Sequence, residues 1–513
     1  MTACTLFSRL TGFVRVLATA AVLGSGLLGD VYQTANMIPN LLFELVALGV
    51  LQSVLLPSYV AARREGEDSL RDAVSATSGV VVVVLGAVAA LGMATSPLMS
   101  RVMVAFEPSS AVVQDKLDVM VPMVLVFVPQ LVFYGLATTA SAALNARGRF
   151  AAAALAPALN NVVVIVACLL FRWSRDGAVA DLHLSVLEFC LISIGTTLGV
   201  VLFGAWPWLA LRRAGVRAVP RWRPEHTAVR QMRKNFGWAT LSIVGTLVPT
   251  ATALALGNGA PGGVAVFVFT FAFFVLPHAL VAVPAATALA PRVAEHWQAG
   301  DTAATRKAID DAVAVMVPLL ALAGAGMVAL AWQVADVMAF GQIASQGLEP
   351  IASAFVAFGF GLVGYGVSFV LARVLFSLDD LRVASRLMIA GAVAGVLVME
   401  LMSEVLDPGS RAAALALGYG ASQAVTAVLL VRRVRRLTGS FSERRPVGLL
   451  GTSVAAAGAA ALAMMATTSV FGGRRRESGA AIAVAGAVGV VVFAAVLLSV
   501  DGRARRSIMA RFG

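Results

Sequence analysis

Two arginines lie near the start of an apolar stretch that is long enough to form a membrane-spanning helix. Arg9 and Arg15 belong to the segment Phe7-Ser8-Arg9-Leu10-Thr11-Gly12-Phe13-Val14-Arg15. A guanidinium keeps its proton in proteins, so at membrane depth it must reach the interface, a wet cavity or an anion. Because its planar fork binds phosphate through paired charge-assisted hydrogen bonds, both arginines are candidate ligands of an anionic substrate.

The spacing of the two arginines separates their expected roles. Six residues apart, they point about 120° away from each other on an ideal helix. They share a cavity only if it is wide or if the helix bends near Gly12. Arg9 comes early in the stretch and has a simpler interpretation as a cation that snorkels to the cytoplasmic boundary. Arg15 lies deeper, and we expect it to bind substrate.

Asp30, just before the next apolar stretch, and Asn40 and Glu44 within it complete the predicted substrate-binding site, which consists of Arg9, Arg15, Asp30, Asn40 and Glu44. Each has an alternative: Asp30 can cap a helix, and Asn40 can join helices by hydrogen bonds. Glu44 can pair with Arg15 or act as a coupling carboxylate.

The overall composition indicates the class of protein that must position these residues. Of the 513 residues, 59% are hydrophobic and 13% are charged, and the mean hydropathy is +0.88. A helix needs about 20 residues to cross the hydrocarbon of a bilayer. We therefore predict an all-α polytopic membrane protein with fourteen spans, at residues 4–27, 31–61, 73–104, 117–144, 151–171, 184–211, 235–257, 263–291, 308–338, 350–377, 383–405, 411–431, 447–470 and 478–500.

Lysine and arginine favour cytoplasmic loops, and their distribution predicts the orientation. With the N-terminus inside, 28 of the 39 Lys and Arg fall on the cytoplasmic side, and Arg9, Arg15 and Arg373 fall within helices. The opposite side holds only Arg101, Lys116, Arg172, Arg175, Arg411, Arg474, Arg475 and Arg476. We expect both termini in the cytoplasm, and we interpret the net charge of +12 as topology and attraction to anionic lipid rather than nucleic-acid binding.

The residue types that catalysis would need do not form a recognisable pattern. Cys4, Cys168 and Cys190 lack the spacing of metal ligands, and the four histidines are scattered. The sequence has no Walker loop, nucleophile elbow or paired-carboxylate motif. We predict no enzyme activity, no catalytic residue, no metal ligand and no cofactor. The N-terminal stretch lacks a basic leader and a cleavage site, which favours a retained first helix.

An internal repeat indicates two lobes. Residues 55–66 resemble residues 289–300, and Tyr134-Gly135 resembles Tyr365-Gly366, at offsets of 234 and 231. An even number of helices per copy predicts a parallel repeat, with a pseudo-twofold axis along the membrane normal and a substrate path between six-helix lobes. The predicted divisions are an N-terminal lobe at 1–213, a basic cytoplasmic linker at 214–234, a C-terminal lobe at 235–437, and a terminal helical hairpin with a basic tail at 438–513.

Several motifs occur in order over at least the first eleven predicted spans. They are Ser8-Arg9-x-x-Gly12-Phe13-x-Arg15, Asp30, Pro39-Asn40-Leu41-Leu42, Gly49, Pro57, residues 145–150 with Pro157, and Arg373-Val374-Leu375-Phe376-Ser377. Together these motifs resemble the MurJ/MviN family of lipid II flippases. The first 65 residues contain the most specific part of the resemblance.

The resemblance implies the multidrug/oligosaccharidyl-lipid/polysaccharide exporter fold and a role in cell-wall synthesis and cell shape. It implies that a basic central cavity receives the pyrophosphate of lipid II and that a lateral groove receives its tail. It also implies alternating access, linked to membrane potential, which moves the lipid to the outer leaflet of the bacterial cytoplasmic membrane. The expected partners are this polyprenyl-pyrophosphate-linked saccharide lipid, membrane lipids and proteins of cell-wall synthesis.

Two departures from the family pattern keep alternatives open. Further cavity arginines usual in the family are replaced by Phe43-Glu44 and by Phe271-Ala272-Phe273-Phe274. The alternatives are a flippase for another polyprenyl-linked saccharide, a cation-coupled drug exporter, and a cell-wall scaffold that transports nothing. Arg9 and Arg15 favour an anionic head group over a cationic drug.

Overall fold

The computed structural model describes residues 2–45, 49–175, 181–338, 341, 347–439, 445–471 and 475–500, and within these ranges all regular structure is helical. The α-helices are α1 (Thr2–Leu23), α2 (Leu27–Phe43), α3 (Gly49–Glu65), α4 (Glu67–Ala94), α5 (Ser96–Met103), α6 (Ser110–Phe127), α7 (Gln130–Ala146), α8 (Phe150–Ser174), α9 (Val186–Arg213), α10 (Thr227–Gly257), α11 (Gly263–Gln298), α12 (Thr302–Ala329), α13 (Ala331–Met338), α14 (Glu349–Ser377), α15 (Leu381–Val405), α16 (Arg411–Thr438), α17 (Arg445–Thr468) and α18 (Arg475–Val500).

The all-α membrane fold predicted from the apolar runs is confirmed, and the helix boundaries refine it. Three predicted spans are each divided into two helices: α4 with α5, α6 with α7, and α12 with α13. A fourth contains α2 and α3, and residues 46–48 between them lie outside the described part of the chain. Proline explains two of these breaks, because it lacks a backbone N–H and cannot continue the hydrogen-bond ladder. Pro97 lies in the first turn of α5, and Pro129 is the N-cap of α7.

Eleven of the described helical segments are long and apolar enough to cross a membrane. They cover every predicted span except those of α1, α2 with α3, and α10. Helices α2 and α3 have 17 residues each, which is short of the roughly 20 that span the hydrocarbon. The predicted count of fourteen spans is therefore approximate.

The chain forms two compact units, and the division falls inside two helices. The first unit contains residues 1–247 and 254–265, and the second contains residues 248–253 and 266–513. Helices α10 and α11 both contribute to each unit.

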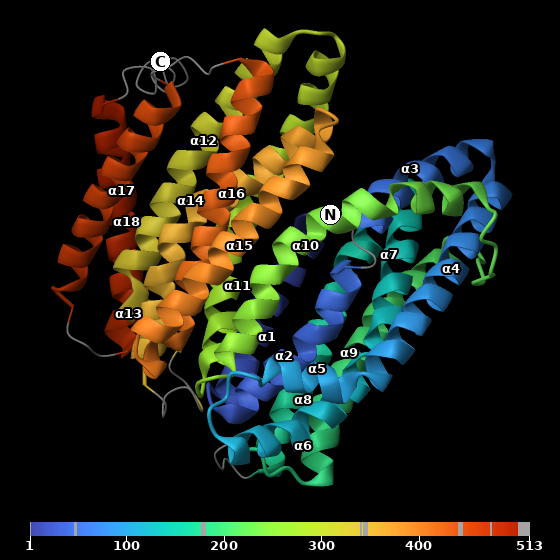
Figure 1. Ribbon diagram of the computed structural model, residues 1–513, viewed down its shortest axis with the longest axis horizontal. Coiled ribbons are helices and arrows are strands. Elements are labelled where there is room, and N and C mark those ends of the chain that lie inside the picture. The colour runs from blue at the N-terminus through green and yellow to red at the C-terminus, as the bar shows by residue number, and fades with distance from the viewer. Residues whose placement is uncertain are drawn as a thin grey trace. The chain divides into compact units, whose positions relative to one another are not determined.

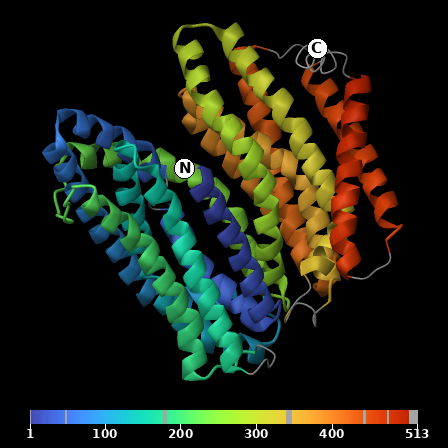
Figure 2. The same ribbon diagram turned by 180° about the vertical axis from the view of Figure 1, so that it is seen from behind.

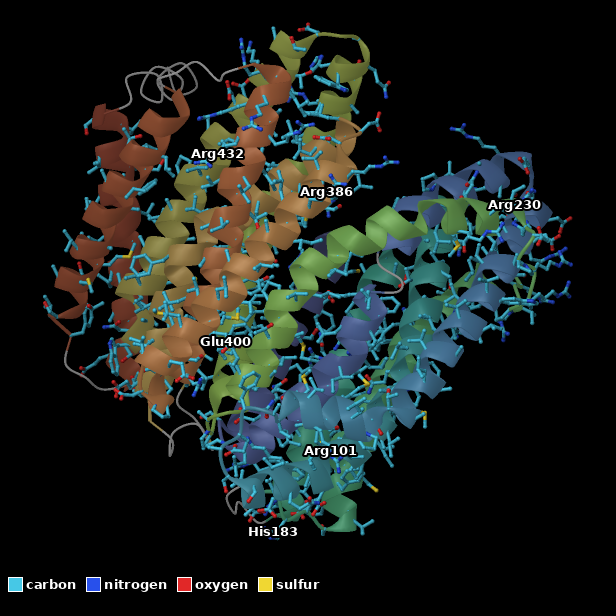
Figure 3. All side chains as sticks on the ribbon, in the orientation of Figure 1. Arg101, His183, Arg230, Arg386, Glu400 and Arg432 are labelled. Atoms are coloured by element: carbon cyan, nitrogen blue, oxygen red, sulfur yellow. The ribbon has the colours of Figure 1, made fainter. Side chains whose placement is uncertain are left out.

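In the first unit, α1 packs on α8, α8 on α9, and α9 on α7 (Figure 2). Its core includes Leu28, Val31 and Phe127, which are fully buried. In Figure 3, Arg230 lies at one end of this unit, and Arg101 and His183 lie at the other. Arg230, predicted to be cytoplasmic, and Arg101, predicted to be external, therefore lie at opposite ends of the unit.

In the second unit, α14, α15 and α16 lie side by side, and α17 and α18 form a hairpin against α12 (Figure 1). Close approach of α14 and α16 depends on glycine. A Cβ at Gly361 would lie 2.7 Å from the Cα of Gly420. Small residues at such crossings allow the close backbone packing that stabilises helix pairs in membranes.

The linker predicted at 214–234 lies against α4 in the first unit. The backbone N–H of Arg221 donates to the carbonyl of Ser75 at 2.9 Å, and the N–H of Val219 donates to the Ser75 hydroxyl at 3.3 Å. A Cβ at Gly79 would lie only 2.1 Å from the Arg221 carbonyl oxygen. The absence of a side chain at Gly79 therefore permits the linker to dock.

His226 begins α10 at the end of this linker, and its Nδ1 accepts the N–H of Ala228 at 3.3 Å. Burial lowers the pKa of His226, Asp72 opposes that shift, and the cationic Arg223 and Arg230 add to it. The shift favours the neutral imidazole, which is the form that accepts a hydrogen bond through Nδ1.

Candidate functional site

One face of α1 packs against α8 and sets the direction of Arg15. The Nδ2 of Asn161 on α8 donates to the Ser8 carbonyl and to the Thr11 hydroxyl, both at 3.3 Å. A Cβ at Gly12 would lie 3.3 Å from the same nitrogen. Arg15 follows Thr11 by four residues and Gly12 by three, which places it on this face of the helix.

Arg15 is half-buried within the first unit. Its charge interacts electrostatically with Tyr32, Tyr134 and Cys168, which come from α2, α7 and α8. The Tyr32 hydroxyl is hydrogen-bonded to Thr196 at 2.8 Å. The ion pairs found among the described residues include none with Arg15. The guanidinium is thus half-buried and has no ion-pair partner among the described residues, which leaves its donors available to an anion.

Arg9 has a different environment. Its side chain is exposed, and it points away from the face of α1 that contacts Asn161. Both residues are helical, so the spacing of six directs their side chains about 120° apart. The structure does not bring Arg9 and Arg15 together at one position.

Asp30 is fully buried, and both of its carboxylate oxygens accept backbone N–H groups. Oδ2 accepts from Gly262 at 2.7 Å, and Oδ1 accepts from Ala265 at 2.8 Å. Since α11 begins at Gly263, the carboxylate lies at the N-terminus of that helix, where unpaired donors and the helix dipole favour negative charge. These bonds give Asp30 the capping role that was one of its two predicted interpretations.

Lys116 adds a cation close to Asp30 that sequence reasoning assigned to an external loop. Its ammonium is fully buried and donates to Glu107 at 2.8 Å and to the Asn258 carbonyl at 2.6 Å. The charge of Lys116 also interacts with Asp30. A signal for its burial existed in the sequence, because Lys116 shares a helical face with the apolar, buried residues Met120, Met123, Val124 and Phe127.

Asn40 and Glu44 lie at the end of α2. The Nδ2 of Asn40 donates to the carbonyl of Asn36 within the same helix at 2.8 Å. Glu44 is the half-buried C-cap residue of α2. The ring of the preceding residue, Phe43, packs against the ring of Tyr134, with 5.5 Å between ring centroids. Among the described contacts, no ion pair joins Glu44 to Arg15. The predicted pairing of these two residues therefore has no supporting contact.

The segment of α11 that lacks the family arginine contributes to an aromatic cluster in the second unit. The ring centroids of Phe271 and Tyr419 are 5.1 Å apart. The ring centroid of Phe274 lies 4.8 Å from that of Phe358 and 5.1 Å from that of Tyr365. Aromatic pairs at these separations stabilise a core beyond their buried area. In this chain the segment therefore supplies packing between α11, α14 and α16.

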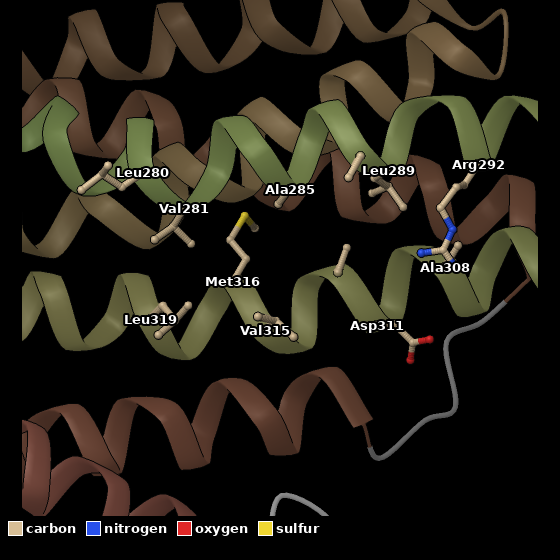
Figure 4. Close-up of a pocket in the computed structure, with 12 residues that line it drawn as sticks. Leu280, Val281, Ala285, Leu289, Arg292, Ala308, Asp311, Val315, Met316 and Leu319 are labelled. Carbon is tan, nitrogen blue, oxygen red and sulfur yellow. The ribbon is translucent and has the colours of Figure 1, made fainter. Parts of the chain in front are cut away.

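A groove of about 420 Å³ lies along α11 and α12 in the second unit. Its walls are apolar apart from Arg292 and Asp311, which lie toward one end, with Leu280 and Leu319 toward the other (Figure 4). Leu280 is 68% exposed, so the groove opens on the surface. Its chemistry suits alkyl chains.

Two proteins named as lipid II flippases match most of this chain in sequence. A protein of Burkholderia cenocepacia named lipid II flippase MurJ is 26% identical over 444 residues, which cover 84% of this chain and 82% of that protein. A probable lipid II flippase MurJ of Rickettsia prowazekii is 21% identical over 380 residues, which cover 74% and 72%.

Solved structures share the fold. A structure of lipid II flippase MurJ in an inward closed conformation matches with a TM-score of 0.75 and 16% identity, over 97% of both chains. An inward-facing multidrug resistance transporter of the MATE family, from the MOP superfamily, matches with a TM-score of 0.66 and 14% identity, over 83% of this chain and 94% of that one.

The sequence also matches a family model. The model described as lipid II flippase MurJ matches residues 19–477, which is most of the 513-residue chain. This range includes Asp30, Asn40 and Glu44, and the sequence motifs from Asp30 to Arg373-Val374-Leu375-Phe376-Ser377, whereas Arg9 and Arg15 precede it. The chain therefore belongs to the MurJ family of lipid II flippases.

Proposed function

We propose that this protein moves lipid II from the inner to the outer leaflet of the bacterial cytoplasmic membrane by alternating access. It would thereby supply the lipid-linked precursor of peptidoglycan. Family membership supports the substrate class, and the helical membrane fold supports transport. Both termini would lie in the cytoplasm, with proteins of cell-wall synthesis as partners.

The environment of Arg15 is the observation that contributes most to this proposal. Arg15 is a half-buried guanidinium on the inward face of α1, and it has no carboxylate partner among the described ion pairs. A cation held in this way within a membrane protein favours an anionic ligand. A pyrophosphate offers several oxygens to a guanidinium fork, and moving it between leaflets requires no covalent step.

The test is complementation of a bacterial strain depleted of its own flippase, combined with an assay of lipid II accessibility at the outer leaflet. We expect the wild-type chain to restore growth and outer-leaflet lipid II. Arg386→Ala is the matched control for Arg15→Ala, since it removes an exposed guanidinium from α15. Normal membrane abundance without any accessible lipid II would contradict the proposal.

The proposed orientation can be measured separately. A cysteine placed at Ser69, at the start of α4, should be inaccessible to a membrane-impermeant label applied from outside. The same result is expected at Ser507, in the basic tail. External labelling at either position would overturn the orientation.

One observation favours a scaffold as the second candidate function. The α11 segment that has an arginine in the family instead forms the aromatic cluster of Phe271, Phe274 and their partners. A scaffold would neither bind lipid II nor restore it to the outer leaflet. A flippase with an altered cavity would bind lipid II and restore it there.

A further inference from the structure

His278 is a buried polar residue of α11 in the second unit that neither the fold nor the substrate site described above explains. Its side chain is 3% exposed. The imidazole stacks on Tyr365 with 4.0 Å between ring centroids, and it meets the edge of Phe369 at 4.7 Å. Tyr365 and Phe369 are one turn apart on α14, so a single face of that helix orients the imidazole.

The ring nitrogen Nδ1 of His278 is buried without a hydrogen-bond partner. Burying a polar atom without a hydrogen-bond partner destabilises the folded protein. If the site served only for packing, phenylalanine would fill the same stack without that penalty. The unpaired nitrogen therefore points to a role in binding a ligand.

Arg373 supplies a second cationic group beside His278. Its guanidinium lies over the ring of Phe369 at 4.5 Å, and its charge interacts electrostatically with His278. The side chain is exposed, and the ion pairs among described residues include none with Arg373. Phe369 thus lies against both groups and holds the guanidinium and the imidazole near each other.

We propose that His278 and Arg373 form a phosphate-binding site in the second unit. Arg373 would provide a fork of charged donors and His278 a ring N–H, and both groups suit phosphate oxygens. A cationic ligand would meet the charge of Arg373, which has no ion-pair partner among the described residues. The site would supply positive charge on α11 and α14, while Phe271 and Phe274 are used for packing.

Resting on the proposed function, the inference names the lipid pyrophosphate as the ligand of this site. The same chemistry would accept the phosphate of an anionic phospholipid, so binding must be measured with separate probes. The three probes are lipid II, inorganic pyrophosphate and phosphatidylglycerol, each added to the full chain reconstituted in nanodiscs of neutral lipid.

Two variants remove the proposed phosphate-binding groups of the protein with little change in packing. His278→Phe keeps an aromatic ring in the stack and removes both nitrogens, and Arg373→Gln removes an exposed charge. Arg386→Gln on α15 is the matched control, because Arg386 is also an exposed arginine of the second unit. Each of the first two variants should weaken binding of lipid II by about tenfold or more, as expected for loss of a charge-assisted hydrogen bond. The control should bind as the wild type does.

A spectroscopic measurement separates ligand binding from packing. In the protein labelled with ¹⁵N-histidine, addition of pyrophosphate should shift the Nδ1 and Nε2 resonances of His278, and Arg373→Gln should reduce that shift. If His278→Phe fails to fold, Arg373→Gln and this spectrum still decide the matter. Unchanged resonances with unchanged affinity of Arg373→Gln would overturn the inference.

The outcomes also distinguish the inference from the proposed function. If the wild type binds and translocates lipid II and both variants do so equally well, the inference is wrong and the function stands. If the wild type binds pyrophosphate in a His278-dependent way but never binds lipid II, the site stands and the proposed function is wrong. Binding of phosphatidylglycerol alone would assign the site to membrane lipid and overturn the named ligand.

Discussion

The carboxylate of Asp30 accepts the backbone N–H of Ala265 at 2.8 Å, which links the start of α2 to the start of α11 across 235 residues of sequence. The bond is buried, and a second one from Gly262 accompanies it. A side chain from one helix thereby caps another helix. The first turn of α11 is fixed within the first unit by this contact.

Replacement of Asp30 by asparagine should destabilise the protein, because the side chain loses its charge and one of its two acceptor oxygens. Loss of a helix-capping contact costs about 1–2 kcal/mol, and Asp30→Ala should cost more than Asp30→Asn. Thermal unfolding of the purified protein in detergent measures the difference. Equal melting temperatures for the wild type and both variants would show that the cap contributes nothing to stability.

Gly79→Ala should release the linker from α4, since the new Cβ would lie 2.1 Å from the Arg221 carbonyl oxygen. Gly86→Ala on the same helix is the control, because a Cβ there meets no heavy atom within 4 Å. Limited trypsin digestion reports docking through cleavage after Arg217 and Arg221. We expect faster cleavage in Gly79→Ala and wild-type cleavage in Gly86→Ala. The prediction fails if the two variants are cut at the same rate.

Arg15→Ala should abolish translocation of lipid II at normal membrane abundance, because it removes the half-buried cation. Arg15→Lys keeps the charge but loses the planar fork, so its activity should be intermediate. The loss of binding expected for alanine is about tenfold to a hundredfold. Arg9→Ala should have a smaller effect, since the Arg9 side chain is exposed. Full activity of Arg15→Ala would exclude a role in binding.

Glu44→Gln tests the acidic residue that the family pattern does not explain. A carboxylate near a bound pyrophosphate opposes it, so removal of the charge should maintain or raise the affinity for lipid II. Glu44→Arg, which introduces the residue type usual in the family, should change the affinity in the same direction. Binding and translocation should be measured together. If Glu44→Gln folds and inserts but no longer transports, Glu44 is a coupling carboxylate and not a weakly opposing charge.

Local patterns predicted the positions of the membrane helices because they depend on short-range physics: apolar runs about 20 residues long require helices in a membrane. The breaks at Pro97 and Pro129 were not predicted, because proline occurs within other helices of the chain without ending them. The partners of the site residues depend on the folded chain. Asp30 meets Gly262 across 232 residues, and no periodicity within α2 indicates that contact.

The same limit applies to His278 and Tyr365, which stack between α11 and α14. Their sequence neighbourhoods predict two apolar helices but do not determine which faces meet. The direction of Arg15 was partly predictable, because helix geometry separates it from Arg9. That this direction faces α8 depends on the contact between Asn161 and Ser8.

Lys116 imposes an order on the biogenesis of the protein. Its buried ammonium needs the Asn258 carbonyl, which is synthesised 142 residues later. The structure shows two partners of the Lys116 ammonium, Glu107 and Asn258. Until Asn258 emerges from the ribosome, only Glu107 has been synthesised. A nascent chain that stops before residue 258 would keep an incompletely satisfied charge. Completion of the first unit during translation therefore waits for residues that lie beyond the middle of the chain.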